Sequence, residues 1–382
     1  MVVHATPVTE VVALDLPPGR AFVDALRRAW DSGDAVVPID PRLPRPAVER
    51  LMAVVRPTWL VDSSGPYRLE GGEPAEPGDA LVVVTSGTVG EPKGVVLTRD
   101  AVAASAEATS ARLQVDRSTD HWLACLPLAH IGGLSVVTRA ILTDTPLTLL
   151  ERFDAARVEA AAKQGATLVS LVATALRRTT TTGFRAVLLG GAAPPDLLPP
   201  NVVTTYGMTE TGSGVVYDGR PLDGVEVRIA DATDGGEGEI LVRGPMLLRA
   251  YRDGAVPLVD DGWLPTGDAG RFEEDGTLAV LGRIAEVVVT GGEKVWPVGV
   301  ELVLGRHPAV AEVAVWKRPD PEWGERVVAW VVPVDPAAPP ALEELRSRVE
   351  AELSPWAAPK EVVVVDHLPR TATGKVRRDS LS

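Results

Sequence analysis

The run Ala80–Thr85 (ALVVVT) constrains the fold more than any other segment, because five apolar residues stand in a row without the polar alternation of a half-exposed strand. Such a run is typical of a short strand covered on both faces, as strands of parallel sheets are. A loop rich in glycine and hydroxyl residues follows, and Thr98 is then a suitable N-cap for a helix over Arg99–Arg112. We therefore expect an α/β fold.

The alternation of strand and helix continues to about residue 190, which indicates mostly parallel sheets with helices on their faces. The expected strands cover residues 122–126, 145–150, 168–172 and 186–189, and the expected helices cover 134–142 and 155–164. Upstream, residues 1–80 are rich in proline and are expected to form short helices and turns, with one amphipathic helix over 19–31.

A change of texture near residue 225 predicts a small β-rich subdomain, because short apolar runs alternate there with Gly/Asp turns. The region after Gly282-Arg283 mixes expected strands (287–290, 310–316, 327–334 and 362–365) with expected helices (298–306 and 341–353). We therefore predict a large N-terminal domain of residues 1–283 and a small α+β domain of residues 284–382. A chain of 382 residues favours two domains, since single cores stop growing at roughly 250–300 residues.

Composition argues against several classes of protein. The chain has 38 basic and 52 acidic residues, a net charge of −14, which argues against a nucleic-acid partner. No apolar run approaches the roughly 20 residues of a membrane span, and the N-terminus lacks the pattern of a signal peptide, so we expect a cytoplasmic protein. The one cysteine, Cys125, can form neither an intrachain disulfide nor a cysteine metal cluster. The oligomeric state stays open between a monomer and a homodimer.

The segment Thr85–Gly94 (TSGTVGEPKG) carries the strongest local signal for function. Small hydroxyl and glycine residues directly after a buried strand let backbone N–H groups approach a phosphate chain, and Lys93 can add a mobile positive charge. The segment is not a Walker A loop, since Pro92 stands where that motif has a glycine before its lysine. Taken alone, it is either a phosphate-binding loop or a glycine-rich turn with a surface lysine.

A second polar segment, Thr204–Gly212 (TTYGMTETG), follows the glycine-rich stretch 189–194. Tyr206 can stack on a base, Thr209 can contact a phosphate, and Glu210 can hold Mg²⁺ together with substrate phosphates. Taken alone, this segment is more simply a polar loop with a packed tyrosine.

Two later segments complete the set. Asp268, in the stretch WLPTGD, can accept both hydroxyls of a ribose, although an Asx-turn is the commoner use of such an aspartate. Lys375 lies on a glycine-containing segment near the C-terminus, which by itself indicates a solvated tail.

In this order and at these separations, the segments resemble the adenylate-forming superfamily of acyl-CoA synthetases, luciferases and peptide-synthetase adenylation domains. The resemblance runs from about residue 80 to the end and implies an enzyme, an AMP-forming acid–thiol ligase that uses ATP, Mg²⁺ and coenzyme A. In that family a carboxylic acid attacks the α-phosphorus of ATP to give an acyl adenylate and pyrophosphate, and a thiol then displaces AMP. The family's small C-terminal domain is mobile and rotates between these half-reactions.

The family's functional residues carry over onto matching positions of this sequence. The resemblance assigns binding of ATP or AMP to Thr85, Ser86, Gly87, Thr88, Gly90, Lys93, Gly190, Gly191, Ala192, Thr205, Tyr206, Gly207, Thr209, Asp268 and Arg283. It assigns the metal to Glu210, catalysis to Lys375, Thr209, Glu210 and His130, and the path of coenzyme A to Gly291, Gly292, Glu293 and Lys294. Lys375 would bridge the acyl carboxylate and the phosphate in the transition state. One position departs from the family, because Ala285 stands at the hinge where Asp or Lys is common.

The stretch Leu126–Arg139 (LPLAHIGGLSVVTR) indicates the acid, because it resembles the o-succinylbenzoate–CoA ligases of menaquinone biosynthesis. Those enzymes carry Pro-Leu-x-His-x-x-Gly with an arginine nine residues after the histidine. The resemblance implies an acyl site of His130, Gly132, Gly133, Ser135 and Arg139, with Arg139 paired to the carboxylate that does not react. Ala129 replaces the usual phenylalanine, and the chain is short for such a ligase, through a reduced N-terminal region.

The alternatives differ in substrate or in class. Other aryl acids and fatty acids are the alternative substrates. A non-catalytic module that binds nucleotide or acyl groups is the rival from a different class, and it is disfavoured because such modules normally lose the catalytic lysine or the metal-binding glutamate. The failed Walker match disfavours a P-loop NTPase, and the close spacing of Cys125 and His130 within the expected acyl pocket disfavours a thioesterase.

Overall fold

The structure, a computed structural model, describes residues 8–86, 92–195, 197–233, 235–370 and 376–381. The chain divides into two compact units, one of Met1–Val227 with Val242–Leu264 and the other of Arg228–Leu241 with Pro265–Ser382. The boundary expected after residue 283 stays a prediction.

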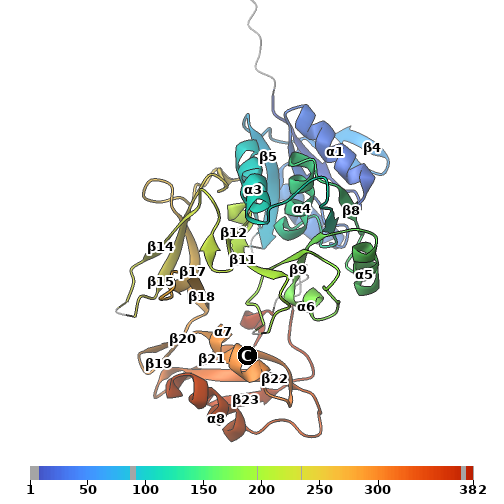
Figure 1. Cartoon of the computed structure of the whole chain (residues 1–382). Coiled ribbons are helices and arrows are strands. Elements are labelled where there is room, and N and C mark those ends of the chain that lie inside the picture. Colours follow the sequence, from blue (N-terminus) through green and yellow to red (C-terminus); the bar gives the residue numbers. More distant parts are fainter. Residues whose placement is uncertain (1–7, 87–91, 196, 234, 371–375, 382) are drawn as a thin grey trace, which may run out of the picture. The chain divides into compact units, whose positions relative to one another are not determined.

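The first unit contains two seven-stranded sheets with helices packed on them (Figure 1). The first sheet has the order β16-β6-β5-β2-β1-β3-β4, and its strands are β1 (Val11–Leu14), β2 (Ala35–Pro38), β3 (Trp59–Asp62), β4 (Gly65–Arg68), β5 (Asp79–Ser86), β6 (Pro92–Thr98) and β16 (Ala250–Tyr251). The pairs β1–β2, β1–β3 and β2–β5 are parallel, and the pairs nearer the edges are antiparallel. The apolar run Ala80–Thr85 lies in β5 and is buried from Ala80 through Val83, as a covered strand requires.

The second sheet has the order β13-β12-β11-β10-β9-β7-β8. Its strands are β7 (Trp122–Ala124), β8 (Leu147–Leu149), β9 (Leu168–Val172), β10 (Ala186–Gly190), β11 (Val202–Met208), β12 (Ser213–Tyr217) and β13 (Arg220–Pro221). The strands from β8 to β11 are paired in parallel, which confirms the alternating strand and helix pattern.

Among the described residues, six helices cover these sheets: α1 (Arg20–Asp31), α2 (Arg45–Val55), α3 (Arg99–Arg112), α4 (Ile131–Leu142), α5 (Ala155–Lys163) and α6 (Ala173–Leu176). The N-cap predicted for α3 is confirmed, because the Thr98 side chain accepts a hydrogen bond from the Ala101 N–H at 3.1 Å. Helix α4 begins three residues earlier than expected, at the position directly after His130. This start places His130 at the N-cap of the helix that carries the candidate acyl residues.

Before residue 80, α1 confirms the amphipathic helix predicted over 19–31, but the prediction of short helices and turns for the rest of this region is wrong. Strands β1 to β4 lie there, with α1 and α2 between them. Each strand is four residues long, and proline ends one of them, so the local pattern is weak. The strands form because β2 pairs with β5, a contact that the neighbouring residues do not encode.

The second unit contains most of a four-stranded sheet and all of a five-stranded one. The four-stranded sheet joins β14 (Glu226–Ala230), β15 (Gly238–Arg243), β17 (Leu264–Phe272) and β18 (Leu278–Arg283), which confirms the β-rich texture predicted near residue 225. The five-stranded sheet joins β19 (Val288–Thr290), β20 (Glu293–Val295), β21 (Val310–Asp320), β22 (Gly324–Pro333) and β23 (Glu361–Val364), and α7 (Pro297–Gly305) and α8 (Leu342–Glu352) belong to this unit. Four short 3₁₀ helices complete the described elements: η1 (Thr209–Thr211), η2 (Ile284–Glu286), η3 (Pro355–Ala357) and η4 (Arg378–Ser380).

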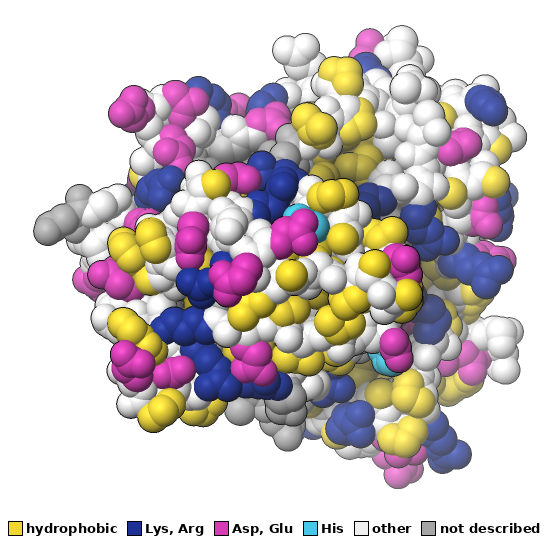
Figure 2. Space-filling model, turned by 90° about the horizontal axis from the view of Figure 1, so that it is seen from below, with side chains coloured by type: hydrophobic (Ala, Val, Ile, Leu, Met, Phe, Trp, Pro, Cys, Tyr) yellow, Lys and Arg dark blue, Asp and Glu magenta, His cyan; other side chains and the backbone are white. Residues whose placement is uncertain are grey.

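Charged side chains of both signs share the surface. On the face that Figure 2 shows, Lys and Arg side chains lie among Asp and Glu side chains. None of the described helices combines the length and the apolar character that crossing a membrane requires.

Candidate active site

The predicted phosphate-binding segment begins on an antiparallel pair of strands. Thr85 on β5 lies directly opposite Lys93 on β6, so the two side chains that were predicted to contact phosphate start from neighbouring backbone positions. Ser86 is the last residue of β5. Gly87, Thr88 and Gly90 lie outside the described residues.

The predicted adenine-binding residues lie at the ends of two neighbouring parallel strands. Gly190 ends β10, Gly191 and Ala192 follow it, and Thr205, Tyr206 and Gly207 lie on β11, so the predicted polar loop is a strand of the sheet. The Thr205 hydroxyl donates to the Leu189 carbonyl at 3.2 Å, which links the two segments. At Gly207 the strand is irregular, and a Cβ there would lie 2.1 Å from the Ser213 carbonyl oxygen, so a larger residue does not fit.

Thr209 and Glu210 begin the 3₁₀ helix η1, directly after β11. The Glu210 backbone carbonyl accepts a hydrogen bond from the Leu248 N–H at 2.8 Å. Its half-buried side chain accepts a hydrogen bond at Oε1 from the Tyr251 hydroxyl at 3.1 Å. Burial and the neighbouring Glu210 carboxylate raise the pKa of Tyr251 to about 12, so the phenol is protonated at neutral pH and donates.

Tyr251 was not among the residues predicted from the sequence. The Lys93 ammonium lies over its ring, 4.8 Å from the ring centroid, so one side chain contacts both the predicted phosphate-binding lysine and the predicted metal-binding glutamate. The sequence gives little sign of this role, since Tyr251 belongs to a strand of two residues.

The side chains around Glu210 fit a magnesium ion that ATP brings with it. Among the described residues, no group of three or more His, Cys, Asp or Glu side chains could hold a metal ion by itself. Mg²⁺ is usually held by one or two carboxylates together with substrate phosphates and water. A single half-buried carboxylate that is oriented by a hydrogen bond suits that mode of binding.

The predicted acyl residues lie on one helix. His130 is the N-cap of α4, and Gly132, Gly133 and Ser135 occupy its first turns. A Cβ on Gly133 would lie 2.4 Å from the Pro127 carbonyl oxygen, so the helix can pass this close to the preceding segment only with glycine at that position. The Ser213 hydroxyl donates to the Ser135 hydroxyl at 3.4 Å, which links α4 to β12. Ser213 begins β12 shortly after Glu210 in the sequence.

His130 has a carboxylate close to its ring. Its Nε2 lies 4.0 Å from Oδ2 of Asp40, a buried residue that the sequence reasoning did not select. Asp40 is held mainly by Arg42, whose Nη2 lies 2.6 Å from the same oxygen. Hydrogen bonds from Arg42 hold the pKa of Asp40 below its usual range, so this carboxylate is charged at neutral pH.

Arg139 lies in the interior of the unit, and not on the surface of α4. Its side chain is 1% exposed, and its guanidinium lies over the Trp122 ring at 4.9 Å from the centroid. Nε and Nη1 have no hydrogen-bond partner among the described residues. Burial lowers the pKa of Arg139, but an arginine in a protein keeps its charge at neutral pH. The candidate acyl residues therefore include a buried cation, Arg139, with two nitrogen atoms that can still donate hydrogen bonds.

The predicted ribose residues are brought together in the second unit. Asp268 on β17 and Arg283 on β18 are directly opposite each other, and Arg283 Nε lies 2.9 Å from Asp268 Oδ1. Arg283 also donates through Nη1 to the Thr266 carbonyl at 2.9 Å, and the Thr266 hydroxyl accepts from the Asp268 N–H at 3.1 Å. Asp268 is thus a buried carboxylate whose backbone and side chain are both fixed.

The residues predicted to line the path of coenzyme A form the hairpin between β19 and β20 in the same unit. Gly291 and Gly292 make its turn with φ of +60° and +88°, and Glu293 and Lys294 begin β20. A Cβ on Gly291 would lie 2.6 Å from the Trp323 ring. The Gly291 N–H donates a hydrogen bond to the Trp323 backbone carbonyl at 2.8 Å. Trp323 therefore fixes the shape of this turn. Lys375 lies outside the described residues.

Comparison with known proteins gives consistent matches to an N-terminal and a C-terminal region of the chain. A family model described as AMP-binding enzyme matches residues 62–252, and one described as AMP-binding enzyme C-terminal domain matches residues 299–375. The chain is 40% identical over 367 residues to a probable 2-succinylbenzoate–CoA ligase of Mycobacterium tuberculosis, covering 88% of this chain and 93% of that protein. It is 36% identical over 337 residues to the 2-succinylbenzoate–CoA ligase of Bacillus cereus, covering 78% of this chain and 69% of that one.

Solved structures agree with these relatives. The o-succinylbenzoate CoA synthetase of Bacillus subtilis in complex with its acyl-adenylate intermediate superimposes with a TM-score of 0.85 at 29% identity, covering 99% of this chain and 89% of that one. The same synthetase in complex with ATP and a magnesium ion gives a TM-score of 0.84 at 28% identity, covering 99% and 90%.

Proposed function

The chain belongs to the AMP-binding enzyme family of adenylate-forming proteins, and we propose that within this family it is a 2-succinylbenzoate–CoA ligase. It activates 2-succinylbenzoate (o-succinylbenzoate) with ATP and transfers the acyl group to coenzyme A, giving the acyl-CoA, AMP and pyrophosphate for menaquinone biosynthesis. The likeness to the mycobacterial ligase along most of both chains supports this assignment. A cytoplasmic location is part of the proposal, because ATP and coenzyme A are cytoplasmic substrates.

The chemistry needs positioning and charge stabilisation more than covalent help from the protein. The acid carboxylate attacks the α-phosphorus of ATP, the bond to the pyrophosphate oxygen breaks, and the thiol of coenzyme A later attacks the acyl carbon and releases AMP. Thr85 through Lys93 and Thr209 would contact the phosphates, Tyr206 the adenine, and Asp268 with Arg283 the ribose. Mg²⁺ neutralises phosphate charge when bound, and Glu210 is the residue that would hold it.

The observation that carries the choice of acid is the buried guanidinium of Arg139. A buried cation whose Nε and Nη1 have no partner among the described residues is costly, unless an anion pairs with it. A dicarboxylic substrate brings a second carboxylate that takes no part in the reaction, and it would pair there while His130 and Ser135 face the rest of the acyl group. Aryl acids and fatty acids with a single carboxylate have no second anionic group to pair with Arg139.

Two parts of the proposal concern the C-terminal residues. Residues 284–382 would form a domain that rotates about the 3₁₀ helix η2, which contains Ala285. This domain would present Lys375 in the adenylation step and the Gly291–Lys294 hairpin in the thioester step. The order follows from the chemistry, since the acyl adenylate must be complete before the thiol attacks it.

Acid-dependent exchange of labelled pyrophosphate into ATP tests the proposal. With 2-succinylbenzoate and Mg²⁺ we expect exchange, and with coenzyme A we expect AMP and pyrophosphate as products. Exchange with monoacids but none with 2-succinylbenzoate would refute the substrate. ADP as the product would indicate an NTPase, and binding without any turnover would indicate a non-catalytic module.

A further inference from the structure

Tyr251 lies between the two charged side chains that the proposed function assigns to MgATP. Its hydroxyl donates to Glu210 Oε1 at 3.1 Å, and the Lys93 ammonium lies over its ring at 4.8 Å from the centroid. Within the described part of the chain, no ion pair joins Lys93 to Glu210 directly. A neutral side chain therefore contacts both a cation and an anion that would otherwise attract each other.

The sheet register explains why these side chains meet. Tyr251 on β16 lies directly opposite Val95 on β6, and Lys93 is two residues before Val95 on the same strand. Residues two apart on a strand point to the same face of the sheet, and a diagonal neighbour on the adjacent strand is within reach of a long side chain. Lys93 and Tyr251 thus share one face of the sheet.

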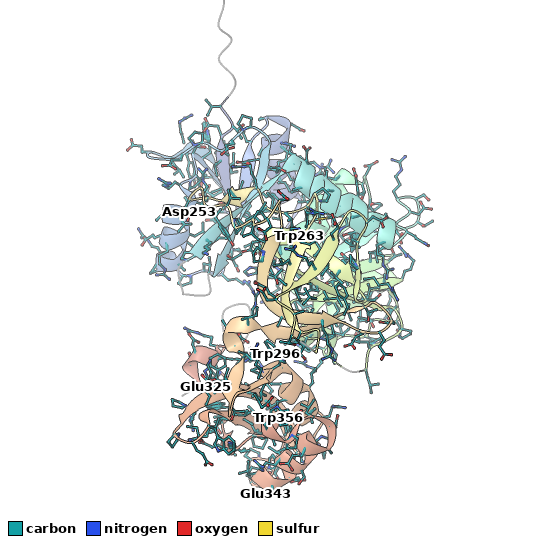
Figure 3. The ribbon with its side chains drawn as sticks, turned by 90° about the vertical axis from the view of Figure 1, so that its left-hand side faces the viewer. Asp253, Trp263, Trp296, Glu325, Glu343 and Trp356 are labelled. Carbon is teal, nitrogen blue, oxygen red and sulfur yellow. The ribbon has the colours of Figure 1, made fainter. Side chains whose placement is uncertain are left out.

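Tyr251 is held firmly from both sides along the chain. Arg249 makes two hydrogen bonds to the buried Asp79 carboxylate, at 2.8 and 2.9 Å, and Arg252 donates to the Val55 and Pro74 carbonyls. The turn after β16, marked by Asp253 in Figure 3, follows directly. The chain on both sides of Tyr251 is therefore anchored by contacts within the protein.

We propose that Tyr251 is a positioning residue, which orients the Glu210 carboxylate for Mg²⁺ and the Lys93 ammonium for phosphate while keeping the two charges apart. The inference rests on the proposed function. In a direct ion pair, Lys93 and Glu210 would neutralise each other's charge. Lys93 would then be less available to phosphate, and Glu210 less available to Mg²⁺. The tyrosine fixes both, since a hydrogen bond occupies one lone pair of Glu210 and the ring face attracts the ammonium without cancelling its charge.

The variant Tyr251→Phe separates the two contacts, since it keeps the ring under Lys93 and removes the hydrogen bond to Glu210. The measurement is calorimetric binding of a non-hydrolysable ATP analogue, once with Mg²⁺ and once with EDTA. We expect Tyr251→Phe to weaken binding roughly tenfold with Mg²⁺, as for loss of a hydrogen bond to a charged group, and to leave binding in EDTA within about twofold. Tyr251→Leu also removes the ring and is expected to weaken binding in EDTA by roughly two- to fivefold.

Tyr67→Phe is the matched control, because Tyr67 is another tyrosine of the same sheet, on β4, and the Asp62 carboxylate raises its pKa. It should bind the analogue like the native chain. Combining Tyr251→Phe with Glu210→Gln completes the test: if Tyr251 acts through Glu210, the double variant loses no more Mg²⁺ dependence than Glu210→Gln alone. Additive losses, or a Tyr251→Phe variant with native Mg²⁺ dependence, would overturn the role of Tyr251. A native chain whose affinity for the analogue does not depend on Mg²⁺ would instead refute the proposed function.

Discussion

Arg139→Met is predicted to separate stability from specificity. Methionine has a similar length and fills the same space without charge or donors. Two unpartnered buried donors cost about 1–3 kcal/mol each, and loss of the desolvated contact with Trp122 costs about 2 kcal/mol, so the free protein should gain about 2 kcal/mol of unfolding free energy. This sign agrees with buried ionic groups elsewhere, whose replacement by apolar residues is often neutral or stabilising by about 1–4 kcal/mol.

The same variant should lose most of its activity toward the dicarboxylic acid. One or two hydrogen bonds to a charged group, about 2–4 kcal/mol in all, predict a fall in kcat/KM for 2-succinylbenzoate of roughly 30- to 1,000-fold. A benzoate-like monoacid does not use the guanidinium, so its low activity should change by less than about threefold on that reasoning.

Urea unfolding and initial-rate kinetics with both acids measure these effects. Arg178→Met is the matched control, because Arg178 also lies over an aromatic ring, Phe153 at 5.4 Å, but is exposed. If the variant is less stable than the native protein and its kcat/KM falls equally for both acids, the reasoning is refuted, since Arg139 would then be a structural residue.

Three further predictions concern other residues. Lys375→Ala should slow single-turnover adenylation by roughly 10²–10³, about 3–4 kcal/mol, as loss of a preorganised charge-stabilising donor does, and unchanged rapid-quench rates would remove Lys375 from the mechanism. Asp268→Asn should weaken ATP binding roughly tenfold in calorimetry, because an amide accepts hydrogen bonds less strongly than a carboxylate, and native affinity would argue against a ribose contact. Burial raises the pKa of Cys125 to about 12, so its thiol stays protonated below that pH and should react with iodoacetamide only after unfolding, whereas rapid labelling of native protein at pH 8 would contradict its burial.

The elements that could be predicted from sequence are those with local causes. Helix α3 begins at Arg99 because the side chain of the preceding Thr98 caps it, and β5 is a covered strand because its residues are apolar without alternation. Asp268 and Arg283 lie opposite each other because a short turn joins β17 to β18 in one antiparallel hairpin. In each case the residues that decide the structure lie within one short segment of the chain.

The features that were missed depend on distant residues. Strands β1 to β4 are too short for their own pattern to stand out, and they exist because β2 pairs with β5 and the others with one another. Tyr251 contacts Glu210, 41 residues earlier, and Lys93, and only the placement of β16 against β6 brings the three together. The burial of Arg139 also depends on a distant residue, since Arg139 lies on helix α4 and the ring beneath it, Trp122, lies on strand β7.

Two of the cations proposed to bind anionic groups of the substrates, Lys93 and Arg139, share one arrangement. Several arginines pair with buried carboxylates, as Arg249 does with Asp79 and Arg185 with Asp120. Lys93 and Arg139 lie instead over the rings of Tyr251 and Trp122, at 4.8 and 4.9 Å, and neither forms an ion pair within the described residues. An aromatic face holds a cation in place through the ring quadrupole and leaves its charge uncompensated. A carboxylate would hold it as well, but an incoming phosphate or carboxylate would then have to displace that partner. Holding a cation on a ring therefore suits a site that must bind two anionic substrates in a protein whose net charge is −14.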